Sequence, residues 1–231
     1  IPNGLFDYAS KAESFDHTFS RTAITGSIPE GLFDYCISAT EFKATFNACS
    51  GLTGNIPKGL FKNNTEVVDF SRTFEECSGL IGSIPEGLFD NCTNVITFYN
   101  TFYDCNGLEG NIPEKLFDNC PKVTTFNGTF YACRRLTGNI PEGLFSNCPN
   151  VNDFSHVFMG CIGLTGSIPE KLFSNNTEVK YFKRTFDSCN GLTGEISKTL
   201  FSNCPKVVSF YYTFNKCYNL TGGIPEGLFN N

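Results

Sequence analysis

The chain repeats one pattern of 28 residues, and this periodicity limits its possible folds more than any other feature. The pattern is clearest at residues 112–139, which read IPEKLFDNCPKVTTFNGTFYACRRLTGN. The unit starts again with an Ile at residues 28, 56, 84, 112, 140, 168, 196 and 224, and a copy of 27 residues starts at Ile1. A fixed period of this length is typical of solenoids, in which each unit packs only on its neighbours.

We therefore expect residues 1–231 to form a single repeat domain of eight coils and one partial coil. Coils 1 to 8 comprise residues 1–27, 28–55, 56–83, 84–111, 112–139, 140–167, 168–195 and 196–223, and the partial coil comprises residues 224–231. A residue's place in its coil, counted from the first residue, is its repeat position. Coil 1 is degenerate, as terminal repeats often are. Because the chain lacks an initiating Met and starts and stops within the repeat, we expect a fragment of a longer chain.

Phenylalanine marks the core of the predicted solenoid. All 25 Phe residues lie at repeat positions 6, 15 and 19. Residues that recur at one angular position of a coil face the same neighbour in every turn, so these rings are expected to stack. Burying each ring contributes about 1.5–3 kcal/mol, which in sum offsets the entropy of ordering many short turns.

Each unit also carries signals of local structure. Ile-Pro-Glu begins a predicted helical or 3-10 turn, since Pro suits its first position and Glu suits its positive end. The segments Val-x-x-Phe and Leu-Thr-Gly-x-Ile are expected to be short extended strands. Stacked at ~4.8 Å per coil, they would form parallel sheets along a rod of about 40 Å. The predicted fold class is an α/β solenoid with short parallel strands and short helical turns.

Two sequence motifs of the unit resemble known leucine-rich repeats. Phe-x-x-Cys-x-x-Leu followed by Ile-Pro resembles the BspA-like repeats of microbial surface proteins, and Leu-Thr-Gly-x-Ile-Pro-x-x-Leu, as at 164–172, is similar to plant-type repeats. The unit departs from both in its length of 28 residues and in its Phe positions. The resemblance implies a leucine-rich-repeat solenoid at the cell surface or outside the cell that binds other macromolecules.

Composition argues against several functions. A net charge of -6 disfavours a nucleic-acid partner, and no run of 18 apolar residues could span a membrane. The two His residues, His17 and His156, lie five coils apart, about 24 Å at ~4.8 Å per coil, so they cannot share a metal or a proton. Nucleophile and phosphate-binding motifs are also missing. We expect no enzyme activity, no cofactor and no metal site.

The 12 Cys residues form two columns, seven at repeat position 22 and five at position 9. In coils 3 and 7 position 9 holds Asn64 and Asn176, yet Cys77 and Cys189 remain at position 22. A disulfide between the columns would leave those cysteines without a partner. This pattern favours buried thiols that pack as small hydrophobic groups, with a disulfide framework as the alternative.

Three further patterns have both a functional and a local explanation. Glu86, Glu114, Glu142 and Glu170 at repeat position 3 could gather calcium, or could serve the first turn of each helical segment. Thr columns at positions 18 and 26 could bind ice, but local hydrogen bonding explains them as well. Asn-x-Thr sequons at Asn63, Asn91, Asn127, Asn175 and Asn219 could carry glycans.

The predicted binding surface consists of the positions that vary. Repeat positions 13, 14, 16, 17, 20 and 21 change between coils, and six of the nine Tyr residues lie there, with cations that include Lys43, Arg72, Lys180 and Lys183. Tyr and Arg commonly anchor protein interfaces. The predicted partner-binding residues, called the tyrosine strip below, are Tyr99, Tyr103, Tyr131, His156, Tyr181, Arg184, Tyr211 and Tyr212. The alternative is that these positions are unconstrained surface.

Two hypotheses about function follow. In the first, the chain is a non-catalytic extracellular or cell-surface module that recognises a protein or glycan, like an adhesin. In the second, it is a structural subunit that stacks head to tail into an extracellular filament, because its two ends share the same repeat phase.

Overall fold

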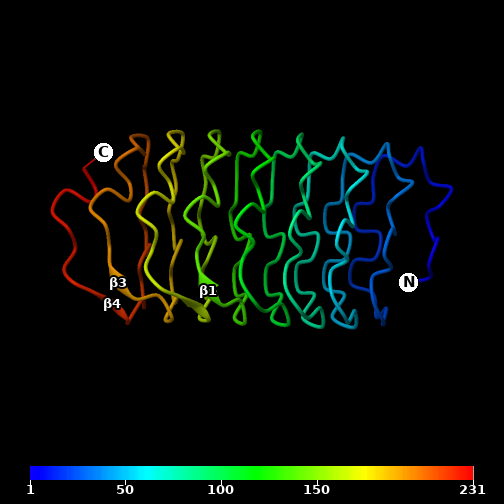
Figure 1. Ribbon diagram of the computed structural model, residues 1–231, viewed down its shortest axis with the longest axis horizontal. Coiled ribbons are helices and arrows are strands. Elements are labelled where there is room, and N and C mark those ends of the chain that lie inside the picture. The colour runs from blue at the N-terminus through cyan, green and yellow to red at the C-terminus, as the bar shows by residue number, and fades with distance from the viewer. Residues whose placement is uncertain (231) are drawn as a thin grey trace.

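The computed structural model describes residues 1–230, which wind into a stack of coils with the two termini at opposite ends (Figure 1). Successive coils lie side by side along the long axis, so residues about 28 apart in the sequence become neighbours. This is the stacked arrangement that the sequence period predicts. Asn231, the last residue of the expected partial coil, lies outside the described residues.

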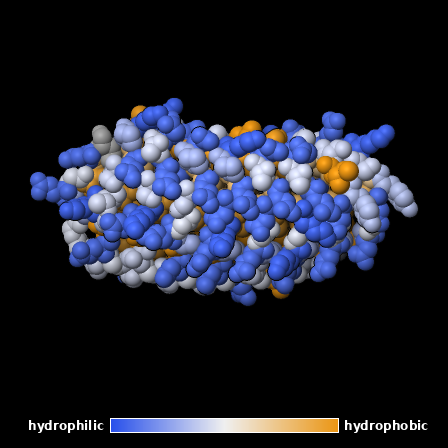
Figure 2. Space-filling model, turned by 45° about the horizontal axis from the view of Figure 1, so that its top comes forward, coloured by the Kyte–Doolittle hydropathy of each residue, from blue (hydrophilic) through white to orange (hydrophobic). Residues whose placement is uncertain are grey.

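The interior is built from rows of phenylalanine rings that run along the rod. Phe98 stacks on Phe126 with ring centroids 5.7 Å apart, and Phe102 stacks on Phe130 at 5.8 Å. Phe117 of the third row lies 4.6 Å from Phe126, tilted by 51°. Offset and tilted arrangements of this kind are favourable for aromatic rings. The surface is largely polar, with small separate apolar patches on the face that Figure 2 shows.

Two ladders of parallel pairing join the coils. The first lies in the Leu-Thr-Gly segment, where β1 (Gly138–Asn139) pairs with β2 (Leu164–Thr165) and β3 (Gly194–Glu195) pairs with β4 (Leu220–Thr221). Single parallel bridges continue this ladder in the other coils, as between Gly54 and Leu80. The second ladder consists of single bridges at repeat position 14, such as Thr97 to Thr125.

The predicted helical and 3-10 turns are not confirmed, because residues 1–230 contain no helix. Each Ile-Pro segment forms separate turns instead. The amides of Leu116, Asp118 and Cys120 donate to the carbonyls of the residues three earlier, at 3.2, 3.2 and 3.0 Å. A 3-10 helix requires such bonds from consecutive amides, but here only every second amide makes one. The segment therefore advances around the coil without closing into a helix.

Repeat positions 17 and 21 adopt left-handed backbone in all eight coils. The residues there are 14 non-glycine residues with φ between 52° and 62°, together with Gly128 and Gly160. Arg72 shows the cause: it is the third residue of a turn in which Thr73 N donates to Phe70 O at 3.2 Å, and its own amide donates to Tyr99 O in the next coil at 2.8 Å. None of these residues is β-branched, as expected where φ is positive. The two positions are therefore constrained and do not vary freely.

All twelve cysteines are free thiols, and all but Cys217 are buried. In the position-22 column each thiol donates to a Phe carbonyl of the preceding coil, as Cys105 does to Phe74 O at 2.9 Å. Asn64 fills the same role in the position-9 column, where its Nδ2 donates to Phe33 O at 3.2 Å and to Cys36 O at 2.8 Å. Both columns thus supply hydrogen-bond donors that link adjacent coils.

Candidate functional site

The backbone ladder between coils brings the tyrosine strip onto one side of the rod. The amides at positions 17 and 21 donate to carbonyls at positions 16 and 20 of the next coil, as Glu76 N does to Tyr103 O at 2.7 Å and Asp104 N to Tyr131 O at 2.8 Å. Side chains at equal repeat positions therefore lie about 4.8 Å apart from coil to coil. The variable positions form a continuous row because every coil repeats the same bonds.

Three residues of the strip form an aromatic group in the middle of the rod. The Tyr103 and Tyr131 rings meet edge to face with centroids 4.7 Å apart, and the His156 ring lies 6.2 Å from Tyr131. All three side chains are half-buried. Burial raises the pKa of Tyr103 and lowers that of His156, although Asp153 opposes the shift at His156. The group thus offers a mainly uncharged aromatic surface.

Three further residues gather in coils 7 and 8. The Arg184 guanidinium lies 4.9 Å from the centre of the Tyr212 ring and 5.8 Å from that of Tyr211. The two tyrosine rings contact each other edge to face at 4.3 Å. Cation–π contacts of this kind hold an Arg side chain in a defined position. This group is the most exposed part of the strip, since Tyr211 is 57% and Tyr212 48% exposed.

The two remaining residues of the strip have cationic neighbours. Tyr181 has the Lys183 ammonium 5.0 Å from its ring centre, and Tyr99 has the Arg72 guanidinium at 5.3 Å. The eight strip residues therefore share one side of the rod but belong to separate groups. They do not converge on a single pocket.

The sequence analysis missed two buried carboxylates beneath the strip. Glu75 is 7% and Asp187 1% exposed, and both lie at repeat position 20. Glu75 pairs with Arg72 at 3.5 Å and Asp187 pairs with Arg184 at 3.1 Å. Burial raises the pKa of Glu75, while Arg72 opposes that shift. In the sequence these pairs are visible as an Arg followed three residues later by an acidic residue. The spacing becomes informative only when both positions are known to face the same side of the rod.

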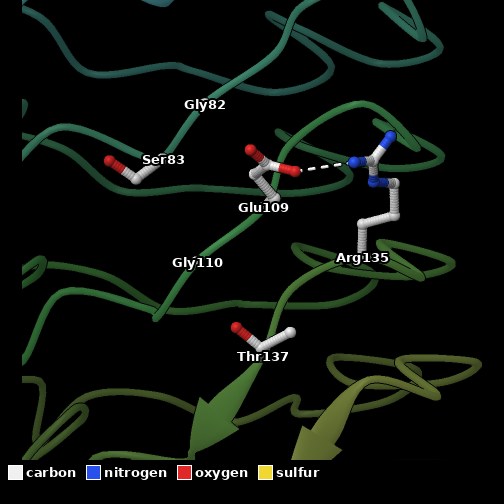
Figure 3. A pocket seen from close by; sticks show the side chains of 6 residues that line it. All are labelled: Gly82, Ser83, Glu109, Gly110, Arg135 and Thr137. Carbon is white, nitrogen blue, oxygen red and sulfur yellow. Dashed lines mark hydrogen bonds and ion pairs between the residues drawn. The ribbon is translucent and has the colours of Figure 1, made fainter.

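Surface pockets lie elsewhere on the rod. One of about 610 Å³ is lined by Gly82, Ser83, Glu109, Gly110, Arg135 and Thr137. Figure 3 shows Glu109 and Arg135 reaching toward each other from adjacent coils, and their charged groups are 2.6 Å apart. Both side chains are more than half exposed, and exposed ion pairs of this kind contribute about 0–1 kcal/mol.

A second pocket, of about 980 Å³, is lined by Glu86 and Glu114 of the acidic column at repeat position 3, together with Asp90 and Asp118. Within residues 1–230, no group of three or more His, Cys, Asp or Glu side chains could hold a metal ion. No helix long and apolar enough to cross a membrane occurs in that range either.

The structure also places the Thr column at repeat position 18 and the sequons. Thr101 at position 18 is buried, and its hydroxyl donates to Phe70 O of the preceding coil at 2.9 Å. Because this column is internal, it cannot present an array to ice. The sequon residue Asn91 is exposed, and its Nδ2 donates to Lys62 O at 2.8 Å. Its amide therefore links two coils.

Comparison with known proteins identifies relatives by sequence profile and by fold. A family profile described as "Mycoplasma protein of unknown function, DUF285" matches residues 40–168 and 119–226. No curated protein matches. The fold is similar to the leucine-rich-repeat ectodomain of the plant membrane receptor kinase GASSHO1/SCHENGEN3 from Arabidopsis thaliana, with a TM-score of 0.56, 22% identity and 81% of this chain covered.

A TDR receptor structure is also similar, with a TM-score of 0.51, 21% identity and 99% of this chain covered. The chain covers only 20% of the GASSHO1/SCHENGEN3 structure and 38% of the TDR receptor structure. At these identities the likeness concerns the fold. It supports a leucine-rich-repeat-like solenoid.

Proposed function

Because this chain belongs to the family described as Mycoplasma protein of unknown function, DUF285, and has a leucine-rich-repeat-like fold, we propose that it is a non-catalytic recognition module. In this proposal the module acts at the cell surface or outside the cell, as an adhesin does, and holds a protein or glycan partner on the tyrosine strip. It uses no cofactor, and the BspA-like character suggested by the sequence belongs to the same proposal.

The observation that carries the proposal is the row of aromatic and cationic side chains on a rigid repeat. Tyr103 and Tyr131 are half-buried and in mutual contact, so they lose little conformational freedom when a partner covers them. Such pre-positioned aromatic residues are typical anchors of interfaces. The GASSHO1/SCHENGEN3 ectodomain structure contains CASPARIAN STRIP INTEGRITY FACTOR 2, which supports recognition of a peptide or protein over recognition of a glycan.

The test begins with peptides selected for binding to the whole chain from a random displayed library. Each selected peptide is then titrated against the parent chain, Tyr103→Ala and Tyr131→Ala. We expect each substitution to weaken binding about tenfold, since aromatic anchors contribute roughly 1–2 kcal/mol or more.

Tyr35→Ala is the matched control, because Tyr35 is 58% exposed at repeat position 8, outside the strip. It should leave the affinity unchanged. If selected peptides bind the two strip variants as tightly as the parent chain, the strip is not the recognition surface.

Head-to-tail stacking of whole chains into a filament remains a second candidate function. It is favoured because each coil makes the same hydrogen bonds to the next coil along the rod. A coil donates backbone bonds on one side, as Phe74 N does to Thr101 O of coil 4 at 2.9 Å, and accepts them on the other, as Thr73 O does from Phe46 N of coil 2 at 2.9 Å. Two solenoid ends therefore carry complementary groups. Under this proposal, light scattering finds a particle mass that rises with concentration and negative-stain images show rods longer than one chain. A constant mass and short single rods would contradict it.

A further inference from the structure

The rod contains the same three-residue arrangement twice, four coils apart. In each copy an Arg at repeat position 17 pairs with a carboxylate at position 20 of its own coil and lies against a Tyr ring at position 16 of the next coil. The first copy is Arg72, Glu75 and Tyr99, and the second is Arg184, Asp187 and Tyr211. The Arg amide donates to the Tyr carbonyl at 2.8 Å in both.

Buried carboxylates hold the two Arg side chains in place. Asp187 accepts hydrogen bonds at Oδ1 from Asn215 Nδ2 at 3.0 Å and from Ser188 Oγ at 2.9 Å, and its Oδ2 lies 3.1 Å from Arg184 Nη1. With its carboxylate partner fixed and two rings beside it, Arg184 is pre-positioned, yet its side chain remains 33% exposed. A guanidinium has five N–H donors, so donors remain for a ligand.

Glu75 is held in a comparable way. Its Oε2 accepts from Asn47 Nδ2 at 3.1 Å and its Oε1 lies 3.4 Å from Asn100 Nδ2. The Arg72 side chain is 44% exposed. The two Arg residues are therefore supported alike, which makes one a control for the other.

Their surroundings have opposite charge. Repeat positions 13–21 of coils 7 and 8 contain four cations and one carboxylate, namely Lys180, Lys183, Arg184, Lys216 and Asp187. The same positions of coils 3 and 4 contain one cation and four carboxylates, namely Arg72, Asp69, Glu75, Glu76 and Asp104. The chain as a whole carries -6, so the basic part of the strip stands out against an acidic molecule.

We propose that the coil 7 and coil 8 part of the strip binds an acidic segment of a protein partner, with Arg184 as its anchor. This proposal rests on the proposed recognition function and names its partner chemistry. A carboxylate of the segment accepts hydrogen bonds from the free edge of the Arg184 guanidinium, as charge-assisted pairs of this kind do. Lys183 and Lys216 supply further positive charge, and the exposed Tyr211 and Tyr212 rings cover the apolar part of the segment.

The experiment measures fluorescence anisotropy of a labelled peptide that alternates Glu with Ser, against the whole chain at low salt. A peptide that alternates Lys with Ser is the charge-reversed probe. We expect the Glu peptide to bind and the Lys peptide to bind at least about tenfold more weakly, and binding to weaken as NaCl rises from about 50 to about 300 mM.

Matched variants then assign the site. Arg184→Gln should weaken Glu-peptide binding about tenfold, and Arg72→Gln should change it less than about twofold. Because Arg184→Gln leaves Asp187 buried without its cation, a second pair of variants, R184Q/D187N and R72Q/E75Q, removes both charges in each copy. Circular dichroism confirms that each variant is folded before titration, and the double variants should differ in the same direction as the single ones.

Equal losses from the coil 7 and coil 3 variants, or equal binding of the Glu and Lys peptides, would overturn the proposal. So would tighter binding to anionic lipid vesicles than to the Glu peptide, because the basic group would then recognise a membrane surface. These outcomes leave the recognition function open to its own test, since peptides from the random library can still depend on Tyr103 and Tyr131.

Discussion

At the scale of single residues, left-handed backbone decides what repeat positions 17 and 21 tolerate. Ala48 has a φ of 56°. Its side chain is a single methyl group, so the effect of the backbone conformation on stability can be measured there without other side-chain interactions. A Cβ in this conformation costs about 1 kcal/mol relative to glycine, and a β-branched side chain costs more. The side chains at these positions therefore differ in charge and size, but none of them is β-branched.

Replacing Ala48 with Gly should raise the free energy of unfolding by up to about 1 kcal/mol, because Gly occupies this backbone region without strain. Ala48→Val should lower it by about 1–2 kcal/mol. Urea denaturation followed by circular dichroism measures both. Ala12, whose φ is not positive, is the control, and Ala12→Gly should destabilise by about 0.5–1 kcal/mol. A loss of stability in Ala48→Gly would contradict the argument.

At the scale of the repeated coil, donor columns explain why Cys and Asn replace each other at repeat position 9. Cys148 lies 3.6 Å from Phe117 O and 3.5 Å from Cys120 O, and Asn176 in the next coil donates to the corresponding carbonyls, Phe145 O and Cys148 O, at 3.2 and 2.8 Å. The two residues perform one task, which is to satisfy carbonyl groups between coils. Because the thiols are not paired in disulfides, replacing one Cys leaves no other Cys without a partner.

Asn64→Cys should leave the free energy of unfolding within about 1 kcal/mol of the parent, since the thiol points at the same carbonyls and the unpartnered Oδ1 of Asn64 disappears. Asn64→Ala should cost about 2 kcal/mol, because two buried carbonyls lose their donor. Chemical denaturation in reducing buffer separates the two variants. Equal destabilisation by Cys and Ala would show that the donor has no role in stability.

At the scale of the whole molecule, the buried thiols make stability depend on alkaline pH. Burial raises the pKa of Cys36 and Cys217 to about 11 from the ordinary 9.0, and raises that of Cys92 and Cys204 to about 12. A thiol with a raised pKa in the folded state remains neutral there after the unfolded chain has ionised. Its contribution is complete below pH 9.0 and is lost as pH rises toward its folded pKa.

The free energy of unfolding should therefore fall between about pH 9 and pH 11, by about 1 kcal/mol per pH unit for each thiol whose pKa is raised by burial. Guanidinium titrations in reducing buffer at a series of pH values measure this slope. Cys133→Ala removes one buried thiol and should make the slope shallower, while tyrosine and lysine titration is common to both proteins. A slope identical in parent and variant would rule out the thiols as its source.

Much of the architecture was predictable from the 28-residue period alone, because any residue that recurs once per coil must stack on its own kind. The Phe rows, the coil-to-coil pairing and the position of the tyrosine strip on one side all follow from that rule. The conformation of the Ile-Pro segments was not predictable in the same way. Pro and Glu favour the start of a helix locally, but only every second amide of this segment donates to the carbonyl three residues earlier, as at Leu116 and Asp118, so separate turns form.

The solenoid, its core and the list of residues that vary between coils depend only on periodicity, so they can be read from the chain of amino acids. Which of the varying residues touch depends on how adjacent coils stack. Arg184 and Tyr211 are 27 residues apart in the chain and become neighbours through the ladder between coils. The buried state of Asp187 depends on side chains from two coils as well. Such contacts form because stacking places different parts of adjacent coils against each other, which no single repeat encodes.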